Sequence, residues 1–314
     1  MLYKHITKWY DNKEVIILEL RVLNYFLAVA REESISGAAN ALHLSQPTLS
    51  RQLKDMEDEL GKQLFIRGSK RIELTDEGRI LKKRAEEIIA LVEKTENEIS
   101  VSDEHISGDV FIGAGETVGV RRLTKAAKRV RDSYPDIHFH IISGDRSDVV
   151  ERLDSGLVDF GLVFGSVDET KYESINIPNS DVWGVLIRKD SPLAQKELIE
   201  PKDLYDKPLI VSRQAEKTGI VKRLLHRSAD KLNIVATYNL LFNGALMVQD
   251  GLGCALCLES VHQPERNREL VFKPLTNVLT EEMHVIWKKD NVFSKASQKF
   301  FEEISKGGVT SQYT

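Results

Sequence analysis

The sequence predicts an α/β protein in three parts: a small helical domain that ends in a hairpin, one long helix, and a larger two-lobed region of strands and helices. Three observations predict this division. Residues 18–75 hold short amphipathic stretches of helical period, residues 76–107 repeat apolar residues at heptad spacing, and residues 108–314 alternate apolar runs with amphipathic stretches. A chain of 314 residues exceeds one compact core, so two or three domains are expected.

The composition is that of an ordinary globular protein, with 41% hydrophobic and 29% charged residues. Neither a membrane-spanning apolar run nor a secretion signal is recognisable in the sequence, which predicts a cytoplasmic protein with no membrane partner. Cys254 and Cys257 form a C-x-x-C motif, which can indicate redox or metal chemistry. Core packing is the favoured interpretation, because the motif lies in an apolar run and the sequence offers no second ligand pair for zinc. No cofactor and no metal are expected.

Residues 1–17 show no clear period and do not fit the pattern that begins at Leu18. The codons AAG-GAG-GTG would encode Lys13-Glu14-Val15 and form a strong bacterial ribosome-binding site a short distance before a TTG start codon at position 18. The hypothesis is that translation starts at Leu18 and that residues 1–17 are an untranslated leader. A frayed N-terminal tail is the alternative, and the intact mass of the protein from its native host distinguishes the two.

Three short helices are predicted first. The segments Leu20–Arg31 and Ile35–Leu42 each place apolar residues on one face at spacings of three and four. Ser45 is the expected N-cap of the third helix, Pro47 lies in its first turn, and Gly61 ends it. Two such helices joined by about three residues are typical of a helix-turn-helix, although any small helical bundle would show the same pattern.

Polar residues at the start of the third helix favour contact with DNA, because Gln can pair with adenine and Arg with guanine in the major groove. A solvated face would use the same residue types. The next segment favours DNA, since residues 63–67 and 71–74 are predicted strands joined by a basic turn, a wing suited to the DNA backbone. The candidate DNA-binding residues are Ser36, Ser45, Gln46, Pro47, Thr48, Ser50, Arg51, Lys54, Arg67, Lys70 and Arg71.

Charge alone does not predict this partner. The chain has a net charge of −4, and residues 18–75 hold eight basic and eight acidic residues. Residues 61–72 are an exception, with four basic residues and no acid, so they permit a local phosphate contact.

A long run of residues then resembles one family. The matching pattern is Ala38-Ala39-x-x-Leu42-x-x-Ser45-Gln46-Pro47-x-Leu49-Ser50-x-Gln52-Leu53, Glu57-x-x-Leu60-Gly61-x-x-Leu64-Phe65-x-Arg67 and Leu74-Thr75-x-x-Gly78. It resembles the DNA-binding domain of LysR-type transcriptional regulators. The resemblance implies that Gln46, Pro47, Ser50 and Arg51 lie at the major groove of double-stranded DNA and that Arg67 holds a phosphate. The family's winged helix usually begins near the start of the chain, which supports Leu18.

The long helix is predicted from residue 76 to about residue 102, with Thr75 as its cap. Its apolar positions alternate at spacings of four and three, the seam of a coiled coil. The expected dimer interface consists of Leu81, Ala85, Ile88, Val92 and Ile99. Packing onto its own domain is the alternative, but dimerisation is favoured and implies a DNA target with two half-sites. The resemblance implies that dimers commonly pair into tetramers.

Residues 108–314 are predicted to form two lobes with parallel sheets, the first from 108–165 and 271–314 and the second from 166–270. The predicted strands cover 110–113, 137–142, 159–165, 182–188, 209–212, 235–239, 254–258 and 284–287. The segments that resemble the LysR effector domain are Gly156-x-x-Asp159-Phe160-Gly161-Leu162, Lys189-Asp190-x-Pro192-Leu193 and Gly251-Leu252-Gly253-x-Ala255-Leu256. That domain is similar to type-II periplasmic binding proteins, whose two lobes close on a small molecule.

Ligands of α/β sheets bind at the carboxyl ends of strands, so residues that follow predicted strands are the candidate effector contacts. They are Glu116, Thr117, Ser143, Phe164, Ser212 and Arg213. Arg213 could pair with an anion, whereas Glu116 would prefer a cation or a hydrogen-bond donor, so the charge of the effector stays open. Each could instead be a loop or cap residue.

The sequence thus predicts a DNA-binding transcriptional regulator that a small-molecule effector controls, and not an enzyme. The second hypothesis is an enzyme with an appended DNA-binding domain, but the sequence contains no G-x-S-x-G, H-E-x-x-H or phosphate-loop motif. The third is a constitutive DNA organiser without a ligand. Metabolite binding without turnover would exclude the second, and a footprint that shifts with a metabolite would exclude the third.

Overall fold

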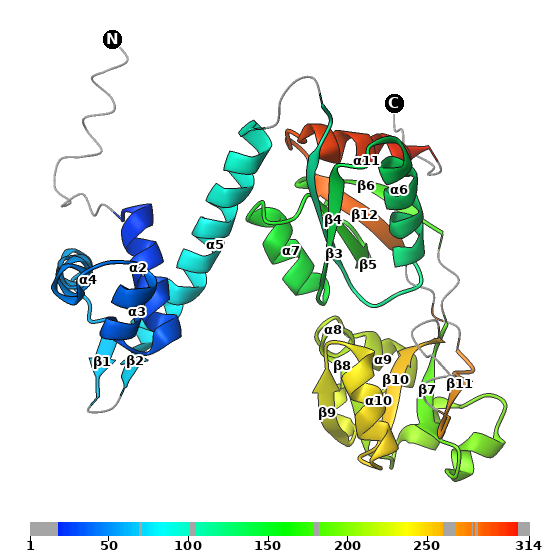
Figure 1. The fold of residues 1–314 in the computed structure, drawn as a ribbon. Coiled ribbons are helices and arrows are strands. Elements are labelled where there is room, and N and C mark those ends of the chain that lie inside the picture. Colours follow the sequence, from blue (N-terminus) through cyan, green and yellow to red (C-terminus); the bar gives the residue numbers. More distant parts are fainter. Residues whose placement is uncertain are drawn as a thin grey trace. The chain divides into compact units, whose positions relative to one another are not determined.

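The computed structural model describes residues 18–68, 71–100, 105–178, 182–259, 268–277, 279 and 282–306, except the side chains of Arg67 and Ser100. The chain divides into two units, Met1–Glu96 and Asn97–Thr314 (Figure 1). The hypothetical leader and Lys70 lie outside the described residues. Within the described ranges, no helix is both long enough and apolar enough to cross a membrane.

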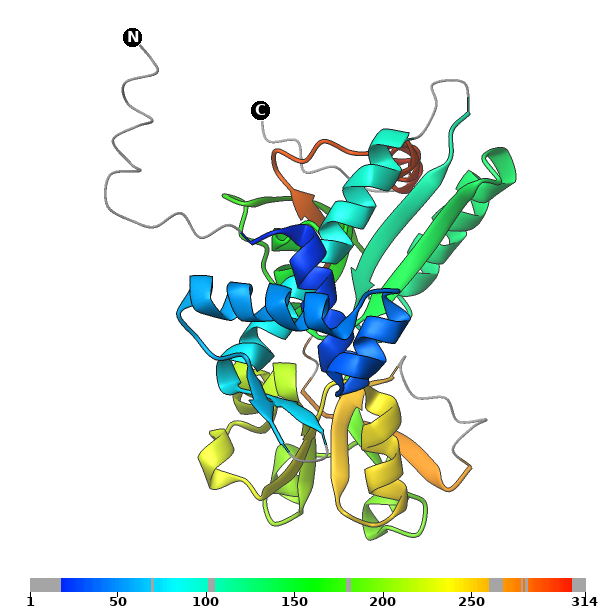
Figure 2. The ribbon, with the colours of Figure 1, turned by 60° about the vertical axis from the view of Figure 1, so that its left-hand side comes forward.

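The N-terminal unit contains the predicted helices and hairpin. Its elements are α2 (Leu20–Glu32), α3 (Ile35–Ala41), α4 (Gln46–Leu60), β1 (Phe65–Arg67), β2 (Ile72–Leu74) and α5 (Asp76–Ser100), whose last residues, from 97 on, belong to the second unit. Figure 1 views α4 down its axis, and Figure 2 shows it from the side with the β1–β2 hairpin after it. The Oγ of Ser34 caps α3 and the Oγ of Ser45 caps α4, each by accepting a hydrogen bond from a backbone N–H. Gly61 ends α4 at a φ of 61°, a left-handed conformation that favours glycine.

The hairpin is held against the helices by backbone contacts. The Glu57 carboxylate of α4 accepts hydrogen bonds from the backbone N–H groups of Leu64 (2.6 Å) and Phe65 (3.1 Å). Thr75 caps α5 by accepting from Gly78 N (2.9 Å), and its hydroxyl donates to the Gln63 carbonyl. A Cβ on Gly78 would lie 2.2 Å from the Leu64 carbonyl oxygen, so only glycine allows this approach. These contacts fix the hairpin relative to α4.

The C-terminal unit contains two five-stranded mixed sheets. The first has the order β4-β3-β5-β12-β6. Its elements are β3 (Gly108–Ala114), α6 (Val120–Ser133), β4 (Ile137–Ser143), α7 (Arg146–Asp154), β5 (Phe160–Phe164), β6 (Tyr172–Ile177), β12 (Met283–Lys288) and α11 (Lys295–Ser305). α6 and α11 pack on one face of this sheet around Phe160 and Phe300, and α7 packs on the other through Val149 and Leu153.

The second sheet has the order β11-β7-β10-β8-β9. Its elements are β7 (Trp183–Arg188), β8 (Leu209–Ser212), α8 (Arg213–Lys217), α9 (Ile220–Leu225), β9 (Ile234–Tyr238), α10 (Leu241–Gln249), β10 (Cys254–Leu258) and β11 (Leu270–Pro274). Short 3₁₀ helices cover Pro192–Gln195, Pro201–Leu204 and Ala229–Lys231. α9 covers one face of this sheet and α10 the other.

The expectation of purely parallel sheets is wrong in part. β3 is parallel to β4 and β5, and β8 is parallel to β9 and β10. However, β12 runs antiparallel to β5 and β6, and β7 runs antiparallel to β10 and β11. The strands β7 and β12 each follow a passage of the chain from one sheet to the other, so they enter their sheets without the helical crossover that parallel pairing requires.

The lobe boundaries at residues 165 and 271 also need correction. β6 lies in the predicted second lobe but pairs with β12 in the first sheet, and β11 begins at Leu270 and pairs with β7 in the second. Both are edge strands, and edge strands tolerate polar residues such as Glu173, Asn176 and Lys273. Those residues interrupt the apolar runs by which buried strands are recognised, so neither strand was predicted.

Candidate DNA-binding surface and ligand pocket

The helix α4 has one buried face and one exposed face. Leu49, Leu53 and Met56 are buried in the core of the N-terminal unit. The predicted DNA-binding residues of this helix share the opposite face: Gln46, Pro47, Thr48, Arg51 and Lys54 are exposed and Ser50 is half-buried. The packing of one face therefore fixes the direction in which the other presents its side chains.

The charged groups on this face have weak intramolecular contacts. The Arg51 side chain is 84% exposed, and its Nε approaches Asp55 Oδ2 at 3.8 Å. Lys54 forms no ion pair with any described residue. Ser45 and Ser36 are exposed, but Ser45 is already used as the cap of α4 and also bonds the Thr48 hydroxyl at 2.7 Å.

The described part of the wing is partly neutralised by acidic neighbours. Arg71 pairs with Glu73 at 3.2 Å and with Glu33 at 3.6 Å. Arg67 belongs to β1, but its side chain, like all of Lys70, is outside the described residues. Of the three basic wing residues that were predicted, the structure therefore tests the surroundings of Arg71 alone.

The predicted seam of α5 is divided between two faces. Ala85 is fully buried, and Leu81 is partly buried against the core of the N-terminal unit, so these two residues pack within their own domain. Ala85 as a dimer contact is therefore a wrong prediction. Val92 is half-buried, whereas Ile88 and Ile99 are exposed. Ile80 and Leu91, which were not in the predicted seam, are exposed as well. The apolar stripe of α5 is wide: one part of it packs on the core of the N-terminal unit, and the other part stays exposed to solvent.

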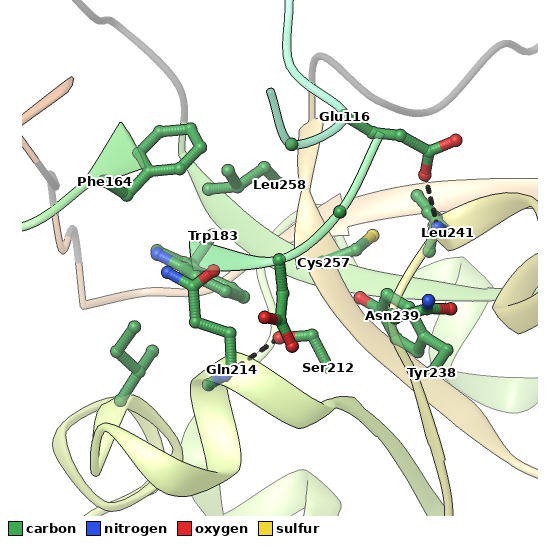
Figure 3. A pocket seen from close by; sticks show the side chains of 15 residues that line it. Glu116, Phe164, Trp183, Ser212, Gln214, Tyr238, Asn239, Leu241, Cys257 and Leu258 are labelled. Carbon is green, nitrogen blue, oxygen red and sulfur yellow. Dashed lines mark hydrogen bonds between the residues drawn. The ribbon is translucent and has the colours of Figure 1, made fainter. Parts of the chain in front are cut away.

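A pocket lies in the C-terminal unit where strand ends of both sheets meet (Figure 3). The space between its walls is about 680 Å³, a figure that includes open solvent at the mouth of the pocket. The lining residues are Gly115, Glu116, Gly144, Asp145, Phe164, Trp183, Ser212, Gln214, Ala215, Ile220, Tyr238, Asn239, Leu241, Cys257 and Leu258. Of the six predicted contacts, Glu116, Phe164 and Ser212 line the pocket, whereas Thr117, Ser143 and Arg213 do not.

The three residues outside the pocket have other contacts. Thr117 accepts a hydrogen bond from Gly119 N (3.2 Å) at the start of α6, and its hydroxyl lies 3.7 Å from Met283 Sδ. Ser143 is the exposed last residue of β4. Arg213 forms ion pairs with Asp145 (2.7 Å) and Asp148 (2.9 Å), so its charge is already balanced.

These ion pairs belong to a set of links between the two lobes. Burial alone would raise the pKa of Asp145, but hydrogen bonds from Ser147 and Arg213 bring it below the usual value. The Glu116 carboxylate accepts a hydrogen bond from the backbone N–H of Leu241 at the start of α10. Gln214 Oε1 accepts from Arg146 N at 3.2 Å. In the links of Arg213 and Leu241 an acidic group of the first lobe accepts from a donor of the second, and in the link of Gln214 the first lobe donates.

Several lining residues were missed because they are aromatic or apolar and occur at strand ends. Trp183 begins β7 and Tyr238 ends β9, and such residues normally indicate core packing. Tyr238 is buried and donates its hydroxyl proton to the Leu256 carbonyl at 2.6 Å. Their place beside the pocket depends on the pairing of strands that are distant in the sequence.

The C-x-x-C residues are free thiols on β10. Cys257 is buried and Cys254 is half-buried, and desolvation raises the pKa of the Cys257 thiol to about 12. A neutral, buried thiol is a poor nucleophile and metal ligand. The described residues contain no group of three His, Cys, Asp or Glu that could hold a metal ion.

A winged helix-turn-helix joined to a two-lobed α/β domain with a pocket at its strand ends defines a ligand-controlled DNA-binding regulator. Residues 20–79 match the family described as "Bacterial regulatory helix-turn-helix protein, lysR family", and residues 103–308 match "LysR substrate binding domain". The chain belongs to the LysR family of transcriptional regulators. Since members of this family are transcriptional regulators and not enzymes, the second hypothesis is set aside.

Individual relatives agree with this assignment. The chain is 28% identical to the "HTH-type transcriptional regulator BsdA" of Bacillus subtilis (strain 168), over 91% of this chain and 99% of that protein. It is also 28% identical to a "Probable RuBisCO transcriptional regulator" of Synechocystis sp., over 91% of this chain and 84% of that one. The structure of full-length CbnR complexed with its target DNA has a similar fold, with a TM-score of 0.69 at 19% identity over 92% of this chain and 99% of that chain.

Proposed function

We propose that the exposed face of α4 reads the operator sequence in the major groove and that the pocket of the C-terminal unit binds the controlling effector. The observation that carries the first role is the two-sided helix α4. Its apolar face is buried, and this packing sets the direction in which the exposed face presents its polar side chains. The pocket at the strand ends of two sheets supports the second role. A regulator that acts on chromosomal DNA works in the cytoplasm, and we propose that location for this chain.

The residues of the DNA-binding surface divide into two kinds of contact. Gln46 and Arg51 are assigned to base edges, because their side chains can form two hydrogen bonds to adenine or guanine. Lys54 and the wing residues Arg67 and Arg71 are assigned to phosphates, which fix orientation and carry no sequence information. Ser45 contributes to the position of α4 through its cap and not through a base contact.

Self-association is assigned to the exposed strip of α5. Ile80, Leu91 and Ile99 are large apolar side chains of α5 that are 66%, 40% and 79% exposed. A second copy of α5 would cover them, and a symmetric dimer would present two α4 helices to two half-sites. Because a dimer has two α4 helices, we expect its operator to contain two half-sites.

Control requires that the effector binds one arrangement of the lobes more tightly than another. The contacts of Arg213 with Asp145 and Asp148, and of Glu116 with Leu241, connect the two lobes beside the pocket. A ligand that strengthens or weakens these links shifts the equilibrium by its difference in affinity for the two states. We place the regulatory step at these contacts.

The test begins with selection of DNA. The purified full chain is mixed with sheared genomic DNA, retained fragments are sequenced, and the enriched site is footprinted with and without a metabolite extract. We expect protection of two half-sites and a footprint that changes with the extract. A protein that retains all fragments equally, or a single protected half-site, would contradict the proposal.

Replacement of Arg51 by Ala separates base reading from general affinity. We expect discrimination between the enriched site and a scrambled site to fall by ~1–3 kcal/mol, because a bidentate base contact is removed. Fluorescence anisotropy with both DNA duplexes measures this difference. Arg21→Ala is the control, since Arg21 is an exposed arginine on α2 that pairs with Glu19 outside the proposed surface. Equal effects of the two substitutions on discrimination would show that Arg51 does not read a base.

A further inference from the structure

We infer that the pocket selects a ring-sized ligand that is uncharged or cationic, donates hydrogen bonds to Glu116, accepts one from Trp183, and is not an anion. This inference rests on the proposed function, because it takes the pocket as the effector site. Its basis is the set of polar groups that the pocket leaves available and the set that is already bonded within the protein.

The described lining contains two carboxylates, those of Glu116 and Asp145, and no lysine, arginine or histidine. Arg213 lies just outside the lining, and its guanidinium is held by Asp145 and Asp148. Arg146 is directed elsewhere, since its guanidinium donates to the carbonyls of Phe164 and Ser166. An anionic ligand would therefore meet negative charge without a free cation to offset it.

Helix N-termini also bind anions in α/β proteins, and three of those beside the pocket, in α7, α8 and α10, already bond side-chain oxygens of the chain itself. The starts of α6 and α9 have no side-chain cap. Asp145 caps α7 by accepting from the N–H groups of Ser147 (2.9 Å) and Asp148 (3.1 Å). Ser212 caps α8 through Ala215 N, and Glu116 bonds Leu241 N at the start of α10 (Figure 3). A carboxylate ligand at the start of α7, α8 or α10 would have to displace one of these oxygens.

Trp183 is the reason to expect a hydrogen-bond acceptor on the ligand. Its side chain lines the pocket, the residue is 7% exposed, and its buried Nε1 has no hydrogen-bond partner among the described residues. A buried donor without a partner is unfavourable, so a carbonyl or ring nitrogen of a ligand would be stabilised there. This indole N–H is an observation independent of the acidic groups.

The remaining walls of the pocket determine the body of the ligand. Phe164, Ile220 and Leu258 are apolar lining residues, and the Trp183 ring adds an aromatic surface. Aromatic and aliphatic walls favour a flat or alicyclic ring over a long polar chain. Glu116 retains acceptor capacity for a ligand N–H beyond its bond to Leu241, because a carboxylate can accept several hydrogen bonds.

Three matched probes test the charge preference: benzamide, benzamidine and benzoate share one ring and differ in the charge of one planar group. Binding to the full chain is measured by isothermal titration calorimetry at neutral pH. We expect benzamide and benzamidine to bind ~10-fold or more tightly than benzoate. Benzoate binding as tight as benzamide would overturn the charge assignment. No detectable binding of any probe would overturn the assignment of a ring-sized ligand.

Two variants assign the contacts. Trp183→Phe keeps an aromatic ring and removes the N–H, so benzamide should weaken several-fold while fluorobenzene, which needs no such donor, should not. Glu116→Gln should lower the ratio of benzamidine to benzoate affinity, and Glu197→Gln, at an exposed position outside the lining, should not. Ratios measured on one protein preparation are independent of a loss of folded protein. Unchanged ratios in both variants would overturn the proposal.

The DNA footprint distinguishes failure of this inference from failure of the proposed function. If the enriched DNA site responds to a carboxylate metabolite whose binding Trp183→Phe and Glu116→Gln leave unchanged, the ligand class is wrong and the regulatory role stands. If benzamide binds in the pocket as expected but no ligand alters the footprint, the ligand class stands and the effector role is wrong.

Discussion

The exposed face of α4 and the pocket of the C-terminal unit hold their charged side chains in opposite states. Arg51 on α4 is 84% exposed with one contact at 3.8 Å to an acid, whereas Arg213 beside the pocket is bound to two carboxylates at 2.7 and 2.9 Å. DNA presents a dense row of phosphates, so a surface that reads it gains from free donors on a rigid support. A small ligand carries few charges, so a pocket whose own charges are paired leaves only specific groups for recognition.

The largest effect is expected from a substitution that disrupts the packing beneath the exposed face of α4. Gly78→Val places a Cβ where it would be 2.2 Å from the Leu64 carbonyl oxygen, so α5 and the hairpin must separate. We expect the free energy of unfolding of the N-terminal unit to fall by about 2–3 kcal/mol, with loss of specific DNA binding. Chemical denaturation followed by circular dichroism, together with anisotropy, measures both.

Gly37→Ala is the matched control for that substitution. A Cβ on Gly37 meets nothing nearer than 3.4 Å, and alanine is the better residue inside a helix, so stability should stay equal or rise. A Gly78→Val protein as stable as Gly37→Ala would mean that the hairpin is not fixed against α5 in the manner described.

The paired state of the pocket charges is tested by pH. Asp145→Asn removes the charge that Arg213 and Ser147 stabilise, and we expect the free energy of unfolding at neutral pH to fall by about 1–2 kcal/mol. The pKa of Asp145 is depressed in the folded protein, so its stabilisation is complete well above the ordinary value of 3.8 and is lost as the pH falls through the lower folded value.

The difference in stability between the native protein and Asp145→Asn should therefore shrink as the pH falls below 3.8. Urea denaturation at a series of acidic pH values measures this difference. Asp168→Asn is the control: hydrogen bonds from Thr170 depress the pKa of Asp168 too, but Arg213 is not among its partners. A difference that grows toward acid pH would contradict the assigned charge pairing.

The DNA-binding domain could be predicted from the sequence because its determinants are local. Ser45 and Gly61 mark the two ends of α4 by cap chemistry that acts within a few residues. The division of α5 could not be predicted, because Leu81 and Ile88 follow one apolar repeat although the first packs on its own core and the second is exposed. Periodicity reports which positions are apolar and not which partner covers them.

The pocket was predicted in kind but not in detail. The rule that strand ends form the site led to Glu116, Phe164 and Ser212, which line it. It also led to Arg213, whose pairing with Asp145 joins residues 68 positions apart in the sequence. The place of Trp183 in the pocket could not be predicted either, because nothing in the sequence around an aromatic residue at the start of a buried strand distinguishes a ligand contact from core packing.

The smallest expected effect compares two basic residues of the DNA-binding surface. Lys54 forms no ion pair with any described residue, whereas Arg71 lies between Glu33 and Glu73. Lys54→Ala should weaken binding of all DNA sequences and lower the slope of log affinity against log salt by ~0.9, the value for one phosphate contact. Arg71→Ala should lower this slope by less, because the two carboxylates already offset much of its charge and DNA must compete with them. Anisotropy titrations at several salt concentrations measure both slopes. A larger change for Arg71→Ala than for Lys54→Ala would show that the basic group paired with carboxylates contributes more to phosphate binding than the unpaired one.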